Sequence, residues 1–292
     1  MAPTLTLADG RELELEVTGP DGGGVLVFIH GTPGGSHQLG QLARAVHARG
    51  HRLVTWSRAG YGASSRRAGR DVASETADAA AVLDHLGVET CVVAGWSGGG
   101  PHALACGALL ADRVRAVTTI AGVAPYDAEG VDFLAGMGED NLEEFGAALK
   151  GAEPLRAWLT AARPQLADVT AAEVAASLET LISEGDRASL TGEFADFLAA
   201  EFRQAVAAGV DGWFDDDLAF VHPWGFDLGD IAVPAYLWQG SEDLMVPFGH
   251  GQWLHGRIPG ATAHLEAGRG HLDILLGHLD TWVEELLAAG SA

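Results

Sequence analysis

Hydrophobic and polar residues follow two different rhythms in the first 124 positions. "TLTL" and "ELELEV" alternate with a period of two around the turn dipeptide Asp9-Gly10, which predicts an antiparallel hairpin at the N-terminus. Continuous apolar runs follow, as expected of strands that are buried on both faces. These predicted strands lie at residues 25–29, 52–56, 91–94 and 114–120.

Stretches with helical periodicity separate the apolar runs. One predicted helix ends near Arg49, and two more lie at residues 72–86 and 98–110. Gly50 and Gly87 follow the first and second of these helices, at positions where glycine commonly ends a helix. Strands and helices that alternate at this spacing form a parallel sheet with helices on both faces. The pattern therefore predicts the α/β class, with a mostly parallel, doubly wound sheet.

The alternation is interrupted once. Residues 125–223 show alanine-rich helical periodicity and no strand-like run, while strands resume at 234–240 and 262–267 and a final helix is expected at 272–289. We therefore expect one α/β core domain formed by residues 1–124 and 224–292. Residues 125–223 are expected to form a helical insertion in that core.

Charge and composition narrow the classes of partner. The 292 residues contain 17 Lys and Arg against 40 Asp and Glu, a formal net charge of −23, and 48% of them are hydrophobic. Such a chain repels phosphate backbones and anionic membranes, so we expect neither nucleic acid nor membrane as a partner. The N-terminus lacks the features of a signal peptide, and a cytoplasmic protein with buried, reduced cysteines is expected. The oligomeric state stays open.

One serine has unusual surroundings. In "VVAGWSGGGPHALA", Ser97 follows a predicted strand and precedes a predicted helix, with Gly95 and Gly99 beside it. A turn between strand and helix can hold a serine in a strained conformation with its hydroxyl exposed, and flanking side chains would collide there. The free N–H groups of the helix start also favour negative charge. We expect Ser97 to be a nucleophile.

An acid and a base follow in the order that such a sheet requires. "WQGSEDLMVP" places Asp243 after one strand, and "EAGRGHLDILL" places His271 after the last strand. Both positions are at carboxyl ends of predicted strands, where parallel sheets place their sites. Other candidates exist for the acid, namely Glu242, Asp273 and Asp127, and for the base, namely His264 and His278.

Taken together, these motifs resemble the α/β-hydrolase superfamily. "GWSGG" is similar to its nucleophile elbow, "HGTPGG" to its oxyanion loop, "SEDLMVP" to its acid turn and "GRGHLDIL" to its histidine loop, and the helical insertion lies where relatives carry a cap. The resemblance implies a catalytic triad of Ser97, Asp243 and His271 and an oxyanion hole formed by the N–H groups of Gly98 and Thr32. It implies no cofactor and no metal.

The chain departs from the family pattern at Ser57, where many relatives have an aspartate, and this puts the local hydrogen bonding of that loop in doubt. A serine nucleophile argues against epoxide hydrolases and haloalkane dehalogenases, which use aspartate. His250 and His255 are expected to be solvated helix histidines because no carboxylate or thiol cluster accompanies them. Four aromatic residues are candidates for contact with an apolar substrate: Trp96, Trp158, Trp213 and Phe214.

The function expected from these features is hydrolysis of a carboxylic ester of a small or medium apolar substrate, through an acyl-enzyme intermediate. Other reactions use the same triad and stay open: a proline iminopeptidase-like aminopeptidase, a carbon–carbon bond hydrolase and a cofactor-free lyase. A ligand-binding receptor on a hydrolase scaffold is the non-enzymatic alternative. The "HGTPGG" motif is near the "HGGPG" of proline iminopeptidases but has Thr32 in place of a glycine.

Overall fold

The computed structural model describes residues 3–291 and contains an eight-stranded sheet. The strands have the spatial order β1-β2-β4-β3-β5-β6-β7-β8. The pairs β1–β2 and β2–β4 are antiparallel, and all pairs from β4 to β8 are parallel. This confirms the predicted fold class, including the N-terminal hairpin. The strand bounds are β1 Thr4–Thr6, β2 Glu12–Thr18, β3 Gly24–Ile29, β4 His51–Trp56, β5 Cys91–Trp96, β6 Val114–Ile120, β7 Ala235–Gly240 and β8 Thr262–Glu266.

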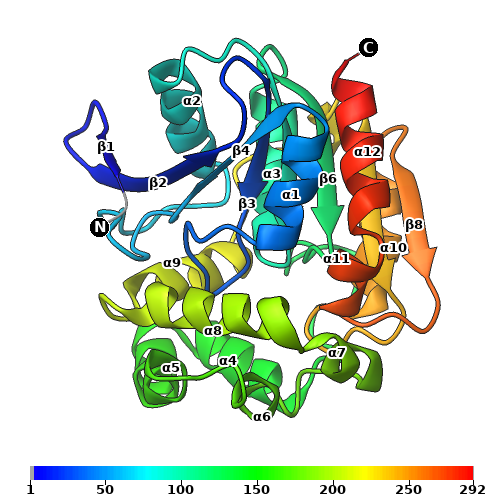
Figure 1. Ribbon diagram of the computed structural model, residues 1–292. Helices are drawn as coiled ribbons and strands as arrows, with labels where there is room; N and C mark the ends of the chain where they lie inside the picture. Colours follow the sequence, from blue (N-terminus) through cyan, green and yellow to red (C-terminus); the bar gives the residue numbers. More distant parts are fainter. Residues whose placement is uncertain (1–2, 292) are drawn as a thin grey trace.

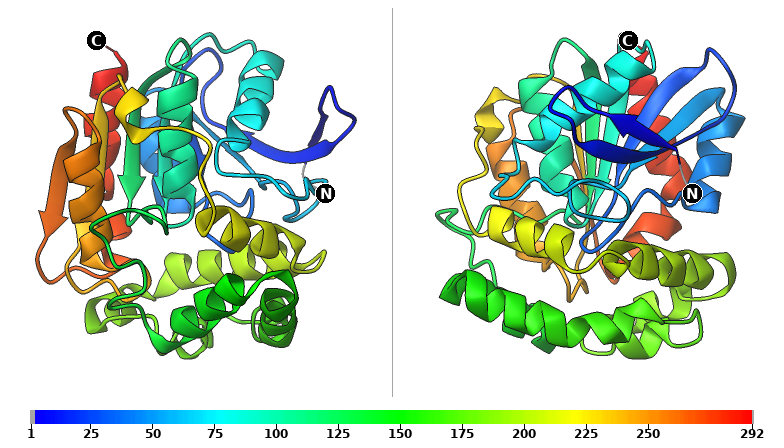
Figure 2. Two further views of the ribbon diagram at one scale, coloured as in Figure 1. Left: turned by 180° about the vertical axis from the view of Figure 1, so that it is seen from behind. Right: turned by 90° about the vertical axis from the view of Figure 1, so that its left-hand side faces the viewer.

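Helices cover both faces of this sheet (Figures 1 and 2). Helices α1 and α12 lie on one face, and α2, α3 and α10 lie on the other. A short helix, α11, precedes α12, and a 3-10 turn, η1, leads into β7. The bounds are α1 Gly40–Ala48, α2 Glu75–His85, α3 Gly99–Leu109, η1 Leu228–Asp230, α10 Phe248–Arg257, α11 Asp273–Gly277 and α12 Leu279–Gly290.

The central strands are buried on both sides, which explains their continuous apolar sequences. Every residue of β5 is buried, and Trp282 of α12 packs on Phe28 of β3 with ring centroids 6.5 Å apart. Each fully buried side chain of this size contributes about 1.5–3 kcal/mol. The two thiols, Cys91 and Cys106, are both buried in this core, as predicted.

A layer of helices lies across one end of the sheet (Figures 1 and 2). The strand arrows of β6 and β8 point toward this layer, so it faces the carboxyl ends of the parallel strands. All residues from 121 to 234 are described, and none of them belongs to a strand. The helix bounds are α4 Glu139–Lys150, α5 Ala152–Ala167, α6 Val174–Ser177, α7 Glu184–Ser189, α8 Gly192–Val206 and α9 Asp211–Phe220.

Three helical details differ from the sequence pattern. The helix expected at 72–86 begins only at Glu75, because the side chain of Asp71 accepts the N–H of Ser74 and forms a turn first. The final helix is divided at His278, whose backbone leaves the helical region between α11 and α12. Helix α10 occupies a stretch in which the sequence pattern marks no helix boundaries.

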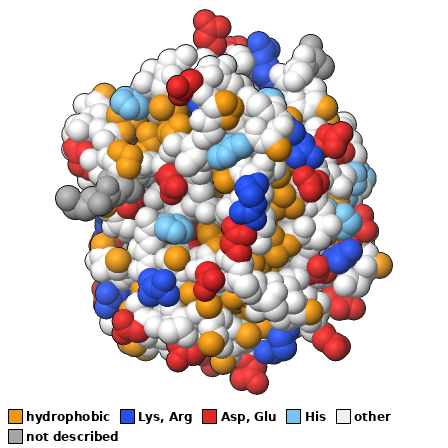
Figure 3. Space-filling view, in the orientation of Figure 1, with side chains coloured by type: hydrophobic (Ala, Val, Ile, Leu, Met, Phe, Trp, Pro, Cys, Tyr) orange, Lys and Arg blue, Asp and Glu red, His pale blue; other side chains and the backbone are white. Residues whose placement is uncertain are grey.

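The surface reflects the excess of acidic residues. Asp and Glu side chains are spread over both the core and the helical layer on the face shown in Figure 3. Among the helices of residues 3–291, none combines the length and the apolar character needed to cross a membrane.

Candidate active site

Ser97 lies in a strained turn between β5 and α3. Its φ of 55° is in the left-handed region, which residues other than glycine rarely adopt. A Cβ atom added to Gly95 would overlap the carbonyl of Gly99, and one added to Gly99 would overlap the carbonyl of Ile29. The two glycines are therefore required for the close packing of this turn. The N–H of Ser97 is held by the carbonyl of Ile120 at 2.8 Å.

His271 and Asp243 meet at the carboxyl ends of β7 and β8. The Nδ1–H of His271 donates to Oδ2 of Asp243 at 2.8 Å, and both side chains are buried. Asp243 is itself held by the N–H groups of Met245 and Val246, at 2.9 and 2.8 Å, and by Nε2 of Gln239 at 3.0 Å. With Nδ1 occupied as a donor, the neutral imidazole keeps Nε2 as an acceptor for a proton.

The other candidates for the acid and the base lie elsewhere. Glu242 and Asp127 are exposed, and Asp273 is paired with Arg269 at 3.0 Å. His264 stacks on Trp238 and bonds to Glu285, and His278 is also packed against Trp238. The geometry thus brings Asp243 to His271 and leaves these side chains outside the pair.

The Thr32 loop approaches Ser97 from β3. A Cβ atom on Gly98 would be 2.8 Å from Cβ of Thr32, so the two residues are in close contact. Among residues 3–291, no group accepts the backbone N–H of either Thr32 or Gly98. These two donors are therefore available to a bound molecule beside Ser97.

A buried carboxylate of the helical layer holds the Thr32 loop. The hydroxyl of Thr32 donates to Oδ2 of Asp216 at 2.8 Å and accepts from Nη2 of Arg58 at 2.9 Å. Arg58 also donates to the carbonyls of His30 and Gly31, and its side chain is fully buried. Helix α9 is thereby tied to the loop that carries the proposed oxyanion donor.

Asp216 is stabilised as an anion by this network. It pairs with Arg58 at 2.5 Å and with Arg70 at 2.6 Å, and it accepts the hydroxyl of Tyr61 at 2.7 Å. Burial alone would raise the pKa of Asp216, but the Arg58 and Arg70 cations hold this pKa well below its ordinary value. Removal of Asp216 would leave two buried cations without their partner.

A second carboxylate of the helical layer holds the histidine loop. Asp186 of α7 is buried and accepts three consecutive backbone N–H groups: those of His271, Leu272 and Asp273, at 3.1, 2.7 and 2.9 Å. These groups are free because they begin α11. Asp186 also completes a capping box with Ser183 at the start of its own helix.

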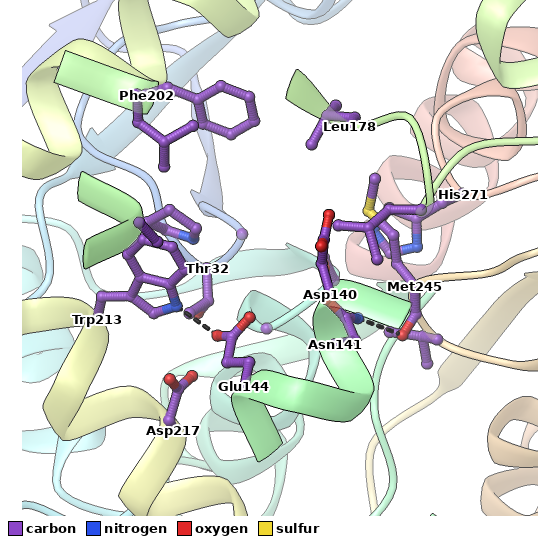
Figure 4. A pocket seen from close by; sticks show the side chains of 18 of the residues that line it. Thr32, Asp140, Asn141, Glu144, Leu178, Phe202, Trp213, Asp217, Met245 and His271 are labelled. Atoms are coloured by element: carbon purple, nitrogen blue, oxygen red, sulfur yellow. Dashed lines mark hydrogen bonds between the residues drawn. The ribbon is translucent and has the colours of Figure 1, made fainter. Parts of the chain in front are cut away.

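A cavity of about 440 Å³ lies between the sheet and the helical layer (Figure 4). Ser97, Gly98, Thr32 and His271 all line it. Three of the four aromatic candidates also line it: Trp96, Trp158 and Trp213. The ring of Trp96 lies 5.6 Å from the ring of His271, centroid to centroid.

The fourth aromatic candidate has a different position. Phe214 is absent from the described lining of the cavity, and its ring is covered by the guanidinium of Arg156 at 4.0 Å from the ring centroid. Arg66 lies on the same ring at 5.6 Å. Trp213 and Phe214 are adjacent in α9 and point about 100° apart, so only Trp213 reaches the cavity.

Three buried carboxyl groups line the same cavity. Burial raises the pKa of Glu144 to about 7 and that of Glu201 to about 8. Burial and the adjacent Glu144 raise the pKa of Asp217 well above its ordinary value. Glu144 accepts Nε1–H of Trp213 at 2.5 Å, and Asp217 lies beside it in Figure 4. Because the two carboxyls are buried and adjacent, they do not readily ionise together.

The Ser57 loop keeps a carboxylate through another residue. The hydroxyl of Ser57 donates to Oε2 of Glu14 at 2.7 Å and accepts the N–H of Ser36 at 2.9 Å. The same oxygen of Glu14 accepts the N–H of Ala63 at 3.1 Å. Glu14, in β2, therefore provides the carboxylate that is missing at position 57.

The expectation that His250 is solvated is wrong. Its side chain is buried, its Nδ1 accepts the N–H of Ala124 at 3.0 Å, and its Nε2 lies 2.9 Å from the carbonyl of Phe133. It joins α10 to the segment that leaves β6. His255 is exposed, and residues 3–291 contain no group of three His, Cys, Asp or Glu side chains that could hold a metal ion.

The local sequence does not indicate several residues of the site. Asp216 and Glu144 lie in helices whose apolar pattern does not mark them, since their partners are far away in the chain. Asp186 lies three residues after Ser183, and this spacing is typical of a capping box at the start of a helix. The spacing predicts the start of a helix, but it does not predict a contact with His271.

Comparisons with known proteins agree with this architecture. The family model described as "alpha/beta hydrolase fold" matches residues 24–278. The "Uncharacterized hydrolase YcgS" of Bacillus subtilis is 27% identical over 94% of this chain and 96% of its own length. A bromoperoxidase from Bacillus anthracis superposes with a TM-score of 0.70 at 24% identity, covering 97% of this chain and 96% of its own. An esterase from Exiguobacterium antarcticum superposes with a TM-score of 0.67 at 18% identity over all of both chains. The chain therefore belongs to the alpha/beta hydrolase fold family, and this membership supports a hydrolase activity.

Proposed function

We propose that this protein is a serine hydrolase that cleaves a carboxylic ester of a small or medium apolar substrate through an acyl-enzyme. One observation carries the proposal: Ser97, in its strained turn, lines the same cavity as His271, whose Nδ1 is bound to buried Asp243. An activated serine needs a base and a group that orients the base.

In the proposed reaction, His271 Nε2 takes the proton of Ser97 while Ser97 Oγ attacks the ester carbonyl. Asp243 stabilises the imidazolium, which then gives its proton to the leaving alcohol. Water attacks the acyl-enzyme in a second step in which His271 again acts as the base. The N–H groups of Gly98 and Thr32 stabilise the oxyanion, each by about 3 kcal/mol.

We also propose that residues 125–223 act as a cap that selects the substrate. A cavity of about 440 Å³ suits a small or medium molecule. Its aromatic lining from this segment includes Trp158 and Trp213, which favours an apolar acyl or alcohol group. The esterase from Exiguobacterium antarcticum shares the fold, which is compatible with this activity.

A fluorophosphonate probe and p-nitrophenyl esters of increasing acyl length test the proposal. The protein is expected to be labelled and to hydrolyse the esters. Ser97→Ala is expected to lose labelling and to lower kcat by at least about 10³-fold with the fold intact. Ser177→Ala is a matched control, because Ser177 lines the same cavity and its hydroxyl is bonded to the carbonyl of Val174.

Persistent turnover in Ser97→Ala, or equal loss in Ser177→Ala, would contradict the assignment of Ser97. Labelling without turnover of any ester would favour the receptor alternative. Hydrolysis of proline amides in preference to esters would favour the aminopeptidase alternative.

A further inference from the structure

The wall of the cavity is acidic as well as aromatic. Its lining includes five carboxyl residues, Asp140, Glu143, Glu144, Glu201 and Asp217, and the described lining contains neither Lys nor Arg. A water-poor cavity with charges of one sign attracts a ligand of the opposite sign and repels carboxylates and phosphates. The cavity therefore discriminates by charge as well as by size.

Two of these carboxyls have oxygen atoms that no protein donor satisfies. Both oxygens of Asp217, which is fully buried, lack a hydrogen-bond donor, and so does Oε2 of Glu201, which is 3% exposed. Buried polar atoms normally have partners, and each exception requires an explanation. Both residues belong to the wall of the cavity, so these buried carboxyls make that wall acidic.

Glu144 and Asp217 form a pair in Figure 4, with Trp213 on one side. When one of the two carboxyls is ionised, the pair carries one negative charge. Aromatic walls add to this charge, since Trp158, Trp213 and Phe220 also line the cavity. A cation beside an aromatic face gains about 0.5–2 kcal/mol when it is removed from water. Carboxylates and aromatic faces together suit an organic ammonium ion.

The pair lies close to the proposed reaction centre. Asp217 and Phe220 are three residues apart in α9, about 4.5 Å along the helix. A Cβ atom on Gly98 would lie 3.0 Å from Cζ of Phe220. Glu144, Asp217 and Gly98 line one cavity of about 440 Å³, so a single small molecule can place an ammonium group at the pair and a carbonyl group at Gly98.

We propose that Glu144 and Asp217 form a subsite for a protonated amine, so that the substrate is an ester that carries an ammonium group a few bonds from its scissile carbonyl. This inference rests on the proposed esterase function and specifies its substrate class. Glu201 adds another buried carboxyl group to the same cavity.

Binding of n-butylammonium and of n-butanol tests the subsite without turnover. Trp96, Trp158 and Trp213 line the cavity, so tryptophan fluorescence of the full chain reports both dissociation constants. We expect n-butylammonium to bind at least about tenfold more tightly than n-butanol, as expected for pairing with a buried charge. A ratio near one in the unmodified protein would overturn the proposal.

Variants on α4 locate the charge that is responsible. Glu144→Gln is expected to lower the ammonium preference to threefold or less, and its amide oxygen can still accept Nε1–H of Trp213. Glu139→Gln is the matched control, because it removes the same charge from an exposed position of the same helix outside the described cavity lining and is expected to keep the preference within twofold. Equal effects of the two variants would overturn the proposal, since they would show only a general surface field.

Circular dichroism checks that each variant is folded. If Glu144→Gln does not fold, Asp217→Asn removes the other carboxyl of the pair and is expected to lower the preference at least threefold. No change in that variant would then overturn the proposal.

Turnover separates this proposal from the proposed function. β-Alanine methyl ester and methyl butyrate differ by an ammonium group in place of a methyl group. The proposal expects a kcat/KM at least tenfold higher for β-alanine methyl ester, and a preference for methyl butyrate would overturn it. If neither these esters nor the p-nitrophenyl esters are cleaved, the esterase proposal fails, and the binding ratio still decides whether the amine subsite exists.

Discussion

Glu201 offers a direct measure of how strongly the cavity penalises a buried charge. It lies in α8, its Oε1 accepts the N–H of Gly35 at 2.8 Å, and its Oε2 has no donor. Burial raises the pKa of Glu201 to about 8 from the ordinary value of 4.5. Between pH 4.5 and about 8, the folded protein keeps a proton on Glu201 that the unfolded chain releases. Stability from this group is therefore fully present below pH 4.5 and is lost as the pH rises toward 8.

The magnitude follows from linkage. Each pH unit between the two pKa values costs about 1.4 kcal/mol, so a change from pH 5.5 to pH 7.5 costs about 2.7 kcal/mol through Glu201. Glu201→Gln cannot ionise and removes this cost. The free energy of unfolding of the variant, relative to the unmodified protein, should rise by about 2.7 kcal/mol between these two pH values.

Urea unfolding followed by circular dichroism and tryptophan fluorescence measures this difference, provided that the two signals coincide. Glu193→Gln is the matched control in the same helix. Glu193 is exposed, and its hydrogen bond with Arg44 lowers its pKa, so it stays ionised from pH 5.5 to 7.5 in both states. A difference between Glu201→Gln and the unmodified protein that does not change with pH would refute the reasoning.

Two further predictions concern α9. Trp213→Ala is expected to shift the preferred acyl chain of p-nitrophenyl esters to a greater length, because it enlarges the cavity. Phe214→Ala should leave the chain-length profile unchanged. Measurement of kcat/KM across the ester series checks this, and equal shifts in the two variants would contradict the geometry. Asp216→Asn is expected to cost about 3–5 kcal/mol in urea unfolding and to lower kcat, because it strands buried Arg58 and loosens the oxyanion loop. Asp215→Asn should cost less, since its partner is partly exposed; an equal cost would count against a special role for Asp216.

The sequence by itself determined the elements and their order. Strands such as β5 are apolar throughout because they are buried on both faces, so their pattern is local and readable. The turn at Ser97 was also readable, since Gly95 and Gly99 are required where no Cβ atom fits. The positions of Asp243 and His271 after their strands followed from the common edge that parallel strands share.

Only the tertiary structure decided which polar groups of the helical layer meet the core. Asp216 and its partner Arg58 are 158 residues apart, and Asp186 and His271 are 85 apart, so no local period relates them. Composition marks Asp and Glu as surface residues, whereas these carboxylates are buried because distant donors compensate for the loss of water.

The same limit applies to the cavity itself. Trp213 and Phe214 are both buried and adjacent, and a helical pattern cannot say which of two buried neighbours faces a cavity and which faces Arg156. That choice depends on the rotation of α9 about its axis, which the ion pairs of Asp216 and the packing of Phe220 against Gly98 set. Local sequence specifies that a helix forms, but its rotation is a property of the contacts that the whole fold makes.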